Sequence, residues 1–126
     1  VYSSPKFYGR FAFTGITTTE EYINANKETV QKFVNAIEKA LQYCHTDEAG
    51  ATEIAAKLFQ NLDKTVVANA VKRMVADKTI PDHAAMSDEA WQKAIQVRVD
   101  IGDMKETKST TDAVDNSFAD NAAKQK

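Results

Sequence analysis

Cysteine, glycine, proline and tryptophan are scarce in this chain of 126 residues, which has one Cys, four Gly, two Pro and one Trp. The single thiol, Cys44, excludes an internal disulfide framework and a cysteine-rich zinc site. The glycines are too far apart to form a G-x-G-x-x-G or Walker loop, which excludes these two phosphate-binding motifs. No apolar run reaches the roughly 18 residues that indicate a membrane-spanning helix.

An excess of positive charge is missing as well. The chain has 16 Lys and Arg against 18 Asp and Glu, and the two signs alternate along the predicted helices. This pattern gives no electrostatic reason to expect a nucleic-acid partner. With 43% hydrophobic and 27% charged residues, the composition is that of an ordinary globular protein. We therefore expect one domain, or one continuous part of a domain.

The N-terminal 18 residues differ from the rest. Residues 1–10, VYSSPKFYGR, contain Pro5 and Gly9 and are expected to be an irregular lead-in or hinge region. They lack an initiator Met and a signal-peptide core, which suggests a processed or truncated end. The next stretch, FAFTGITT at 11–18, carries no charge on either side. It predicts an interior β-strand with both faces covered, although no partner strand is visible in the sequence.

Helices are predicted for most of the remaining chain. A capping box formed by Thr17 with Glu20, or by Thr18 with Glu21, starts the first helix. The N-caps of the next four helices are Asn26, Thr46 or Asp47, Asp63 and Ser87. Gly102 ends the fifth helix, and a weak sixth helix carries Val114 and Phe118.

Apolar residues at spacings of three and four predict the buried face of each helix. The longest stripe is Val30, Phe33, Val34, Ile37, Leu41 and Cys44. The next two helices are expected to bury Ile54, Ala55, Leu58 and Phe59, and then Val66, Val67, Ala70, Val71, Met74 and Val75. The fifth helix presents Trp91, Ala94, Ile95, Arg98 and Val99, with Trp91 expected in the core.

Candidate catalytic residues are few. Cys44 and His45 are neighbours on a helix and point about 100° apart, so they cannot readily share an ion or a substrate. Cys44 is expected in the core, and His83, in the connector 78–86, is expected at the surface, because zinc needs three or four ligands. We expect no enzymatic activity, no cofactor and no metal site.

Aromatic residues gather near the N-terminus: Tyr2, Phe7, Tyr8, Phe11 and Phe13. One interpretation is the entry to the core. The other is a cleft or hinge that contacts a ligand, with Arg10 available for an anionic group.

Three stretches, taken in order, resemble a known pattern. The first is FAFTGITTTEEYINAN and the helix after it, from 11 to 59. The second is NLDKTVVANAVKRM at 61–74, and the third is SDEAWQKAIQVRVDIGDMK at 87–105, followed by DAVDNSFA at 112–119. From about residue 8 to residue 121, this order resembles the C-terminal part of the periplasmic substrate-binding proteins of ABC importers. The branch is the one that handles sulfonates, taurine, nitrate and thiamine-precursor pyrimidines.

The resemblance implies an α/β type II periplasmic-binding fold, in which two lobes close on a ligand. Within it, this segment would be mostly α-helical, with five to six helices and one N-terminal strand, and residues 11–126 would complete the first lobe. The strand 11–18 would be a crossover whose partners are encoded upstream. Ligand contacts are expected at Tyr8, Gly9, Arg10 and Phe11.

The implied partners are a small-molecule solute, the membrane permease of the transporter and the N-terminal part of the same protein. The implied location is the periplasm, or the outer surface of a Gram-positive cell with a membrane anchor. If isolated, the chain is expected to pair its strand with a second copy in a strand-swapped homodimer. The alternative hypothesis is a self-standing helical protein-interaction module that holds a partner helix in a groove.

Overall fold

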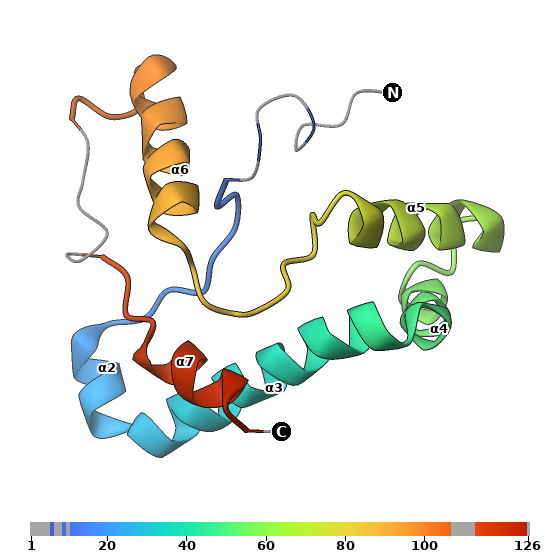
Figure 1. Ribbon diagram of the computed structural model, residues 1–126, viewed down its shortest axis with the longest axis horizontal. Coiled ribbons are helices and arrows are strands. Elements are labelled where there is room, and N and C mark those ends of the chain that lie inside the picture. The colour runs from blue at the N-terminus through green and yellow to red at the C-terminus, as the bar shows by residue number, and fades with distance from the viewer. Residues whose placement is uncertain (1–5, 7–8, 10, 107–112, 126) are drawn as a thin grey trace.

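A computed structural model describes residues 6, 9, 11–106 and 113–125 of the chain. The described residues form six helices: α2 (Glu20–Ala25), α3 (Lys27–Thr46), α4 (Glu48–Leu58), α5 (Lys64–Ala76), α6 (Asp88–Asp100) and α7 (Ser117–Ala123) (Figure 1). The prediction of a mostly helical segment with five to six helices is therefore confirmed.

Local capping chemistry starts three of these helices at predicted residues. Asp47 Oδ1 accepts a hydrogen bond from the Gly50 amide at 2.9 Å, at the start of α4. Asp63 caps α5 and Ser87 caps α6 in the same way. Each side chain satisfies an amide that has no partner inside its helix, which is why these caps fix the starts.

The first helix begins at a different residue from the predicted one. Thr19 is the N-cap of α2, and its Oγ1 accepts from the Tyr22 amide at 3.1 Å. The predicted capping boxes at Thr17 and Thr18 are wrong. Three threonines in a row offer three equivalent caps, so the sequence pattern could not choose the register.

The predicted strand at 11–18 does not form in this chain, since the described residues contain no strand. This segment reaches another element through one backbone hydrogen bond, in which the Ala12 amide donates to the Ala90 carbonyl at 3.0 Å. Phe13 is 83% exposed and Ile16 is 64% exposed, so neither is covered as predicted. A strand needs a continuous ladder with a neighbour, and one hydrogen bond does not make one.

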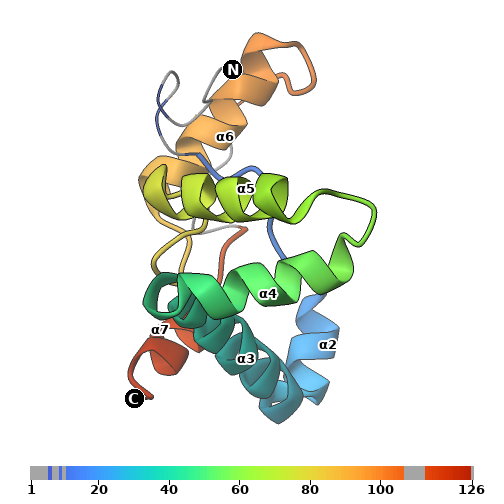
Figure 2. The same cartoon turned by 90° about the vertical axis from the view of Figure 1, so that its right-hand side faces the viewer.

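The helices form an open arrangement. Helix α4 follows at the end of α3, and α5 packs on α4 while running back in the opposite direction to α3 (Figures 1 and 2). At the other end of α3, α7 packs along it and α2 lies beside it. Helix α6 stands apart from this group in Figure 1, and no other described helix packs closely along it. Its place is set by the α5–α6 connector, residues 77–87, and by the segments beside it.

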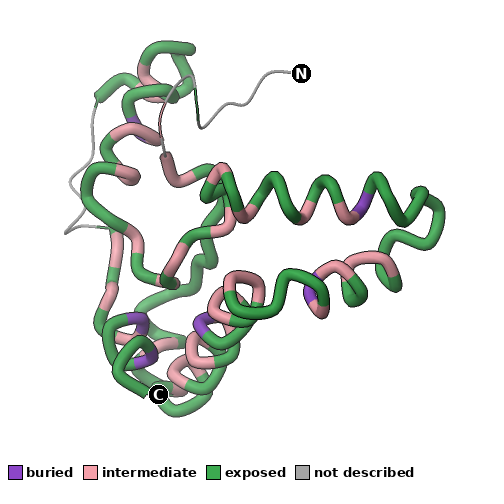
Figure 3. Tube along the Cα trace, turned by 45° about the vertical axis from the view of Figure 1, so that its right-hand side comes forward, coloured by how far each residue is buried: buried purple, intermediate pink, exposed green. Residues whose placement is uncertain are grey.

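Little apolar surface is buried. Among the described residues, the buried apolar side chains are Ala51, Val67, Ile95, Ala119 and Ala122 (Figure 3). The accessible surface is 9517 Å². A folded monomer of 13.9 kDa is expected to expose about 6,700 Å². The chain therefore leaves uncovered an area comparable with a large protein interface.

Several predicted core residues lie in this uncovered area. Leu58 is 76% exposed, Val66 56%, Phe59 54%, Ile54 50% and Phe33 49%. Trp91 and Cys44 are half-buried. The helical spacing correctly marks which residues share a face, but a face is buried only where another element covers it.

A candidate hinge segment and its supports

Two of the four predicted ligand-contact residues, Tyr8 and Arg10, lie outside the described residues, as do Tyr2 and Phe7. Gly9 and Phe11 are described. Gly9 has a φ of +73°, a conformation that L side chains rarely adopt. A Cβ at this position would meet Lys93 Nζ at 2.6 Å, so the α6 ammonium group lies directly beside the Gly9 backbone.

The hinge segment, which we define as the described residues 9 and 11–15, contacts two elements. It meets α6 at Gly9, beside Lys93, and at Ala12, which bonds to Ala90. At Gly15 it meets the connector, where a Cβ would lie 3.5 Å from Met86 Cε. The hinge segment is therefore supported by α6 and by the connector.

A third support lies just before the hinge segment. Lys6 Nζ forms an ion pair with Asp77 Oδ1 at 2.9 Å, at the end of α5. The Asp77 side chain is 6% exposed and also lies 3.5 Å from Arg73 Nε. This ion pair joins Lys6, which precedes the hinge segment in the sequence, to the C-terminal end of α5.

Of the two aromatic residues of the hinge segment, Phe11 is half-buried and Phe13 is exposed. Phe11 and Phe13 pack edge to face, with ring centroids 6.0 Å apart and planes at 79°. Because Phe13 is 83% exposed, the pair does not form an entry to a core within this chain. An exposed aromatic ring such as that of Phe13 can contact a ligand or another protein surface.

Lys93 is a candidate residue that the sequence reasoning missed. Its described ion pair is with Glu89 Oε1 at 3.6 Å, and that glutamate side chain is 83% exposed. Such a pair neutralises charge only weakly in water. The signal in the sequence was an ordinary Glu–Lys spacing of four on one helix, which is typical of a solvated face.

A second missed feature is a polar ladder on α3, which we define as Glu38, Gln42 and His45. Their spacing of four and three places them on one face of the helix. His45 Nε2 lies 3.1 Å from the Pro81 carbonyl oxygen, and Gln42 Nε2 donates to the Asp82 carbonyl at 2.7 Å. The ladder therefore binds successive backbone groups of the connector.

Glu38 is the buried end of this ladder, with a relative exposure of 5%. Its Oε1 lies 2.7 Å from His83 Nδ1, and its Oε2 accepts from the Ala84 amide at 2.8 Å. Burial raises the pKa of Glu38, but the hydrogen bonds from His83, Ala84 and Gln42 outweigh it and hold the pKa below its ordinary value. His83, predicted as a plain surface residue, is exposed and paired with this carboxylate.

The connector is held at a second point by Asn116, the residue before α7. Its Oδ1 accepts from the Met86 amide at 3.0 Å, and its Nδ2 donates to the Met86 carbonyl at 2.8 Å. One side chain thus satisfies both backbone groups of Met86. The connector is fixed to α3 and to the start of α7, and it ends where Ser87 caps α6.

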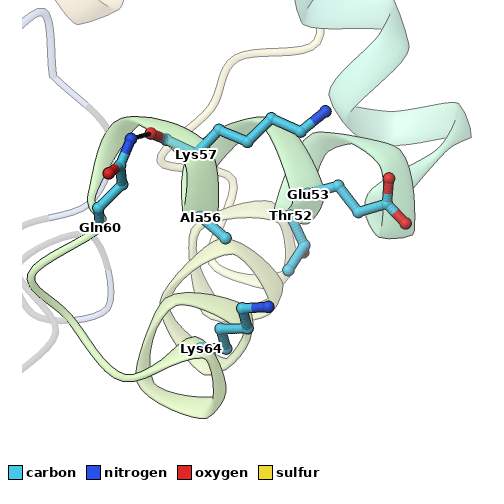
Figure 4. Close-up of a pocket in the computed structure, with 6 residues that line it drawn as sticks. All are labelled: Thr52, Glu53, Ala56, Lys57, Gln60 and Lys64. Atoms are coloured by element: carbon cyan, nitrogen blue, oxygen red, sulfur yellow. Dashed lines mark hydrogen bonds between the residues drawn. The ribbon is translucent and has the colours of Figure 1, made fainter.

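A shallow pocket lies elsewhere, between α4 and α5 (Figure 4). It has a volume of about 500 Å³ and is lined by Thr52, Glu53, Ala56, Lys57, Gln60 and Lys64. The lining comes from α4, the turn after it and the start of α5. No residue of the hinge segment contributes to it.

Two features are absent from the residues that the structure describes. No group of three or more His, Cys, Asp or Glu side chains among them could hold a metal ion. None of the described helices combines the length and the apolar character that crossing a membrane requires.

Comparison with known proteins bears on the same N-terminal region. Residues 2–51 match the family model described as NMT1/THI5 like. The match supports a relationship with the substrate-binding proteins of ABC transporters, a broader statement than the branch that the motifs suggest. No curated protein and no solved structure matches the chain.

The matched region contains the hinge segment, α2, α3 and the start of α4. The stretches at 61–74, 87–105 and 112–119 lie outside it, so their resemblance to the same family stays a prediction. The NMT1/THI5-like match thus bears on the part of the chain where ligand contacts were predicted.

Proposed function

We propose that this chain is the C-terminal part of a solute-binding protein of an ABC import system, and that it binds its solute without changing it chemically. The solute is a small anionic or heterocyclic molecule such as a sulfonate, nitrate or a thiamine-precursor pyrimidine. The protein works in the periplasm, or anchored outside a Gram-positive cell, and delivers its solute to a membrane permease. Its fold is the type II periplasmic-binding fold.

The observation that carries the proposal is the NMT1/THI5-like match over residues 2–51. It agrees in location with the hinge segment, where Gly9 and Ala12 contact α6. In a two-lobed protein, a segment of this kind connects the lobes, and a bound ligand favours the closed state because both lobes contact it.

The uncovered apolar surface supports the same proposal. The chain exposes 9517 Å², far more than its size requires, and Phe13, Ile16 and Phe33 are among the exposed residues. Burial of this apolar surface would be strongly favourable. An α/β part that supplies a sheet would cover the helical faces and give residues 11–18 a strand to pair with.

A binding measurement tests this function. Taurine, nitrate and an aminopyrimidine are titrated by calorimetry into the 126-residue chain and into a longer polypeptide that carries the α/β part. The longer polypeptide is expected to bind one of these solutes at one site, and the chain alone at least about tenfold more weakly. Equal affinity of the two forms, or no binding of any solute to the longer form, would contradict the proposal.

A second candidate is a self-standing helical interaction module. The observation that favours it is the group of exposed apolar residues around the α4–α5 turn, Ile54, Leu58, Phe59, Leu62 and Val66. Such a module has no use for residues 11–18 as a strand. Deleting these residues would leave partner binding intact in a module but would abolish solute binding in a two-lobed protein.

A further inference from the structure

We propose that Glu38 and Asn116 are positioning residues for the hinge segment: they hold the connector, and the connector sets where α6 meets residues 9–12. The role in solute binding rests on the proposed function. The claim that Glu38 and Asn116 position the connector and α6 rests on contacts within this chain.

The first step is the attachment of the connector to α3. The Glu38 carboxylate is buried and accepts from the Ala84 amide at 2.8 Å, while His83 Nδ1 lies 2.7 Å away. Gln42 Nε2 donates both to Glu38 Oε1 at 3.2 Å and to the Asp82 carbonyl at 2.7 Å. Hydrogen bonds to a charged acceptor in a buried place are stronger than ordinary ones.

The second step is the attachment at Met86. Asn116 makes two hydrogen bonds with the Met86 backbone, at 3.0 and 2.8 Å. Asn116 precedes α7, which packs on α3, and Gln31 on α3 donates to the Phe118 carbonyl at 2.9 Å. Both attachments therefore lead back to α3.

The third step is the contact of the connector and α6 with the hinge segment. Helix α6 stands apart from the other helices in Figure 1, and its first residue follows directly on the connector, so the connector contributes to the position of its start although Ile95 further along the helix is buried. Its start carries the Ala90 carbonyl that accepts from the Ala12 amide. The Met86 side chain also lies beside Gly15. A shift of the connector would move both contacts.

The charged groups around Glu38 make this attachment sensitive to pH. His83 faces Glu38 from the connector, and His45 on α3 lies 3.9 Å from Asp82, which also pairs with Lys78 at 3.0 Å. Protonation of Glu38 removes the charged acceptor and weakens the hold on Ala84.

The test is amide hydrogen exchange, resolved by residue with NMR, in the full chain and in Glu38→Gln, Glu38→Ala and Asn116→Ala. Glu28→Gln is the matched control, because Glu28 is an exposed glutamate on the same helix, paired with Lys32. Emission from Trp91, the single tryptophan, reports on α6. In Glu38→Ala, exchange at Ala84 and at Ala12 is expected to rise about tenfold.

The conservative Glu38→Gln is expected to restore part of this protection, since an amide oxygen still accepts from Ala84. Lowering the pH of the wild-type chain protonates Glu38, which weakens its hydrogen bond with the Ala84 amide without a substitution. Unchanged exchange at Ala84 in Glu38→Ala would overturn the attachment. Faster exchange at Ala84 with unchanged exchange at Ala12 and unchanged Trp91 emission would overturn the positioning role.

Solute binding separates this inference from the proposed function. The same substitutions are placed in the longer polypeptide, which is titrated with taurine, nitrate and an aminopyrimidine. Failure of every form to bind, with Ala12 exchange altered, contradicts the function but supports the positioning. Wild-type binding that Glu38→Ala leaves unchanged between pH 5 and pH 8 contradicts the positioning role in solute binding.

Discussion

The side-chain amide of Asn116 pairs with both backbone groups of Met86, accepting from its N–H at 3.0 Å and donating to its carbonyl at 2.8 Å. The two residues are 30 positions apart in the sequence. Asparagine suits this position because its side chain carries a donor and an acceptor in one plane, as a peptide group does.

Asn116→Ala is expected to destabilise the fold by about 2 kcal/mol, since each lost hydrogen bond contributes about 1 kcal/mol. Asn116→Asp retains an acceptor for the Met86 amide but places a carboxylate against the Met86 carbonyl. Urea unfolding followed by circular dichroism measures both variants. Asn24→Ala, at an exposed position of α2, is the control. Equal stabilities of Asn116→Ala and the control would contradict the pairing.

Stability is expected to fall with pH in a way that depends on Glu38. Its folded pKa lies below its ordinary value of 4.5 because of the hydrogen bonds from His83, Ala84 and Gln42. Its contribution is therefore present above pH 4.5 and is lost as the pH falls through the lower folded value.

The difference in unfolding free energy between the wild-type chain and Glu38→Gln isolates this contribution. We expect a difference of about 1 kcal/mol at pH 7 that shrinks as the pH falls below 4.5. The caps Asp47 and Asp63 also have lowered pKa values, through the amides of Gly50 and Thr65, but they titrate alike in both proteins. A difference that does not change with pH would contradict the assignment.

Replacement of two glycines by alanine is expected to have opposite effects. Gly9 has a φ of +73°, so Gly9→Ala should cost about 1 kcal/mol. Gly15 has no such conformation, and its added methyl group would make an ordinary contact with Met86, so Gly15→Ala should be neutral or slightly stabilising. Thermal unfolding of Gly9→Ala and Gly15→Ala measures the change in stability that each substitution causes.

Ser87→Ala is expected to loosen the first turn of α6, because Ser87 Oγ accepts from the Ala90 amide at 3.2 Å. The expected loss is about 1 kcal/mol, and Ser87→Asp should retain the cap. Hydrogen exchange at the Ala90 amide is the measurement. Unchanged hydrogen exchange at the Ala90 amide in Ser87→Ala would show that the cap does not stabilise α6. Equally faster exchange in Ser87→Ala and Ser87→Asp would show the same.

Helix starts could be predicted well from the sequence, for a physical reason. A cap depends on a side chain and an amide two or three residues away, as at Asp47, Asp63 and Ser87. The prediction failed where neighbouring threonines compete, at Thr19, and at the last helix, because α7 begins at Ser117 and leaves Val114 outside it.

Burial and pairing could not be predicted in the same way, because they depend on elements distant in the sequence. FAFTGI has the composition of a covered strand, yet Phe13 is exposed and no ladder forms. Glu38 carries a charged side chain, yet contacts with the connector make it the buried residue of α3. Its spacing with Gln42 and His45 was a usable signal, although many solvated helix faces have the same spacing.

The most direct test of the central claim is hydrogen exchange over residues 11–18, measured in the chain alone and in a longer polypeptide that carries the α/β part. We expect these amides to exchange nearly freely in the chain alone, apart from Ala12, which donates to Ala90. In the longer polypeptide they should be protected at least about a hundredfold, as in a paired interior strand. Equal exchange in the two forms would contradict the claim that this chain is the helical part of a solute-binding protein.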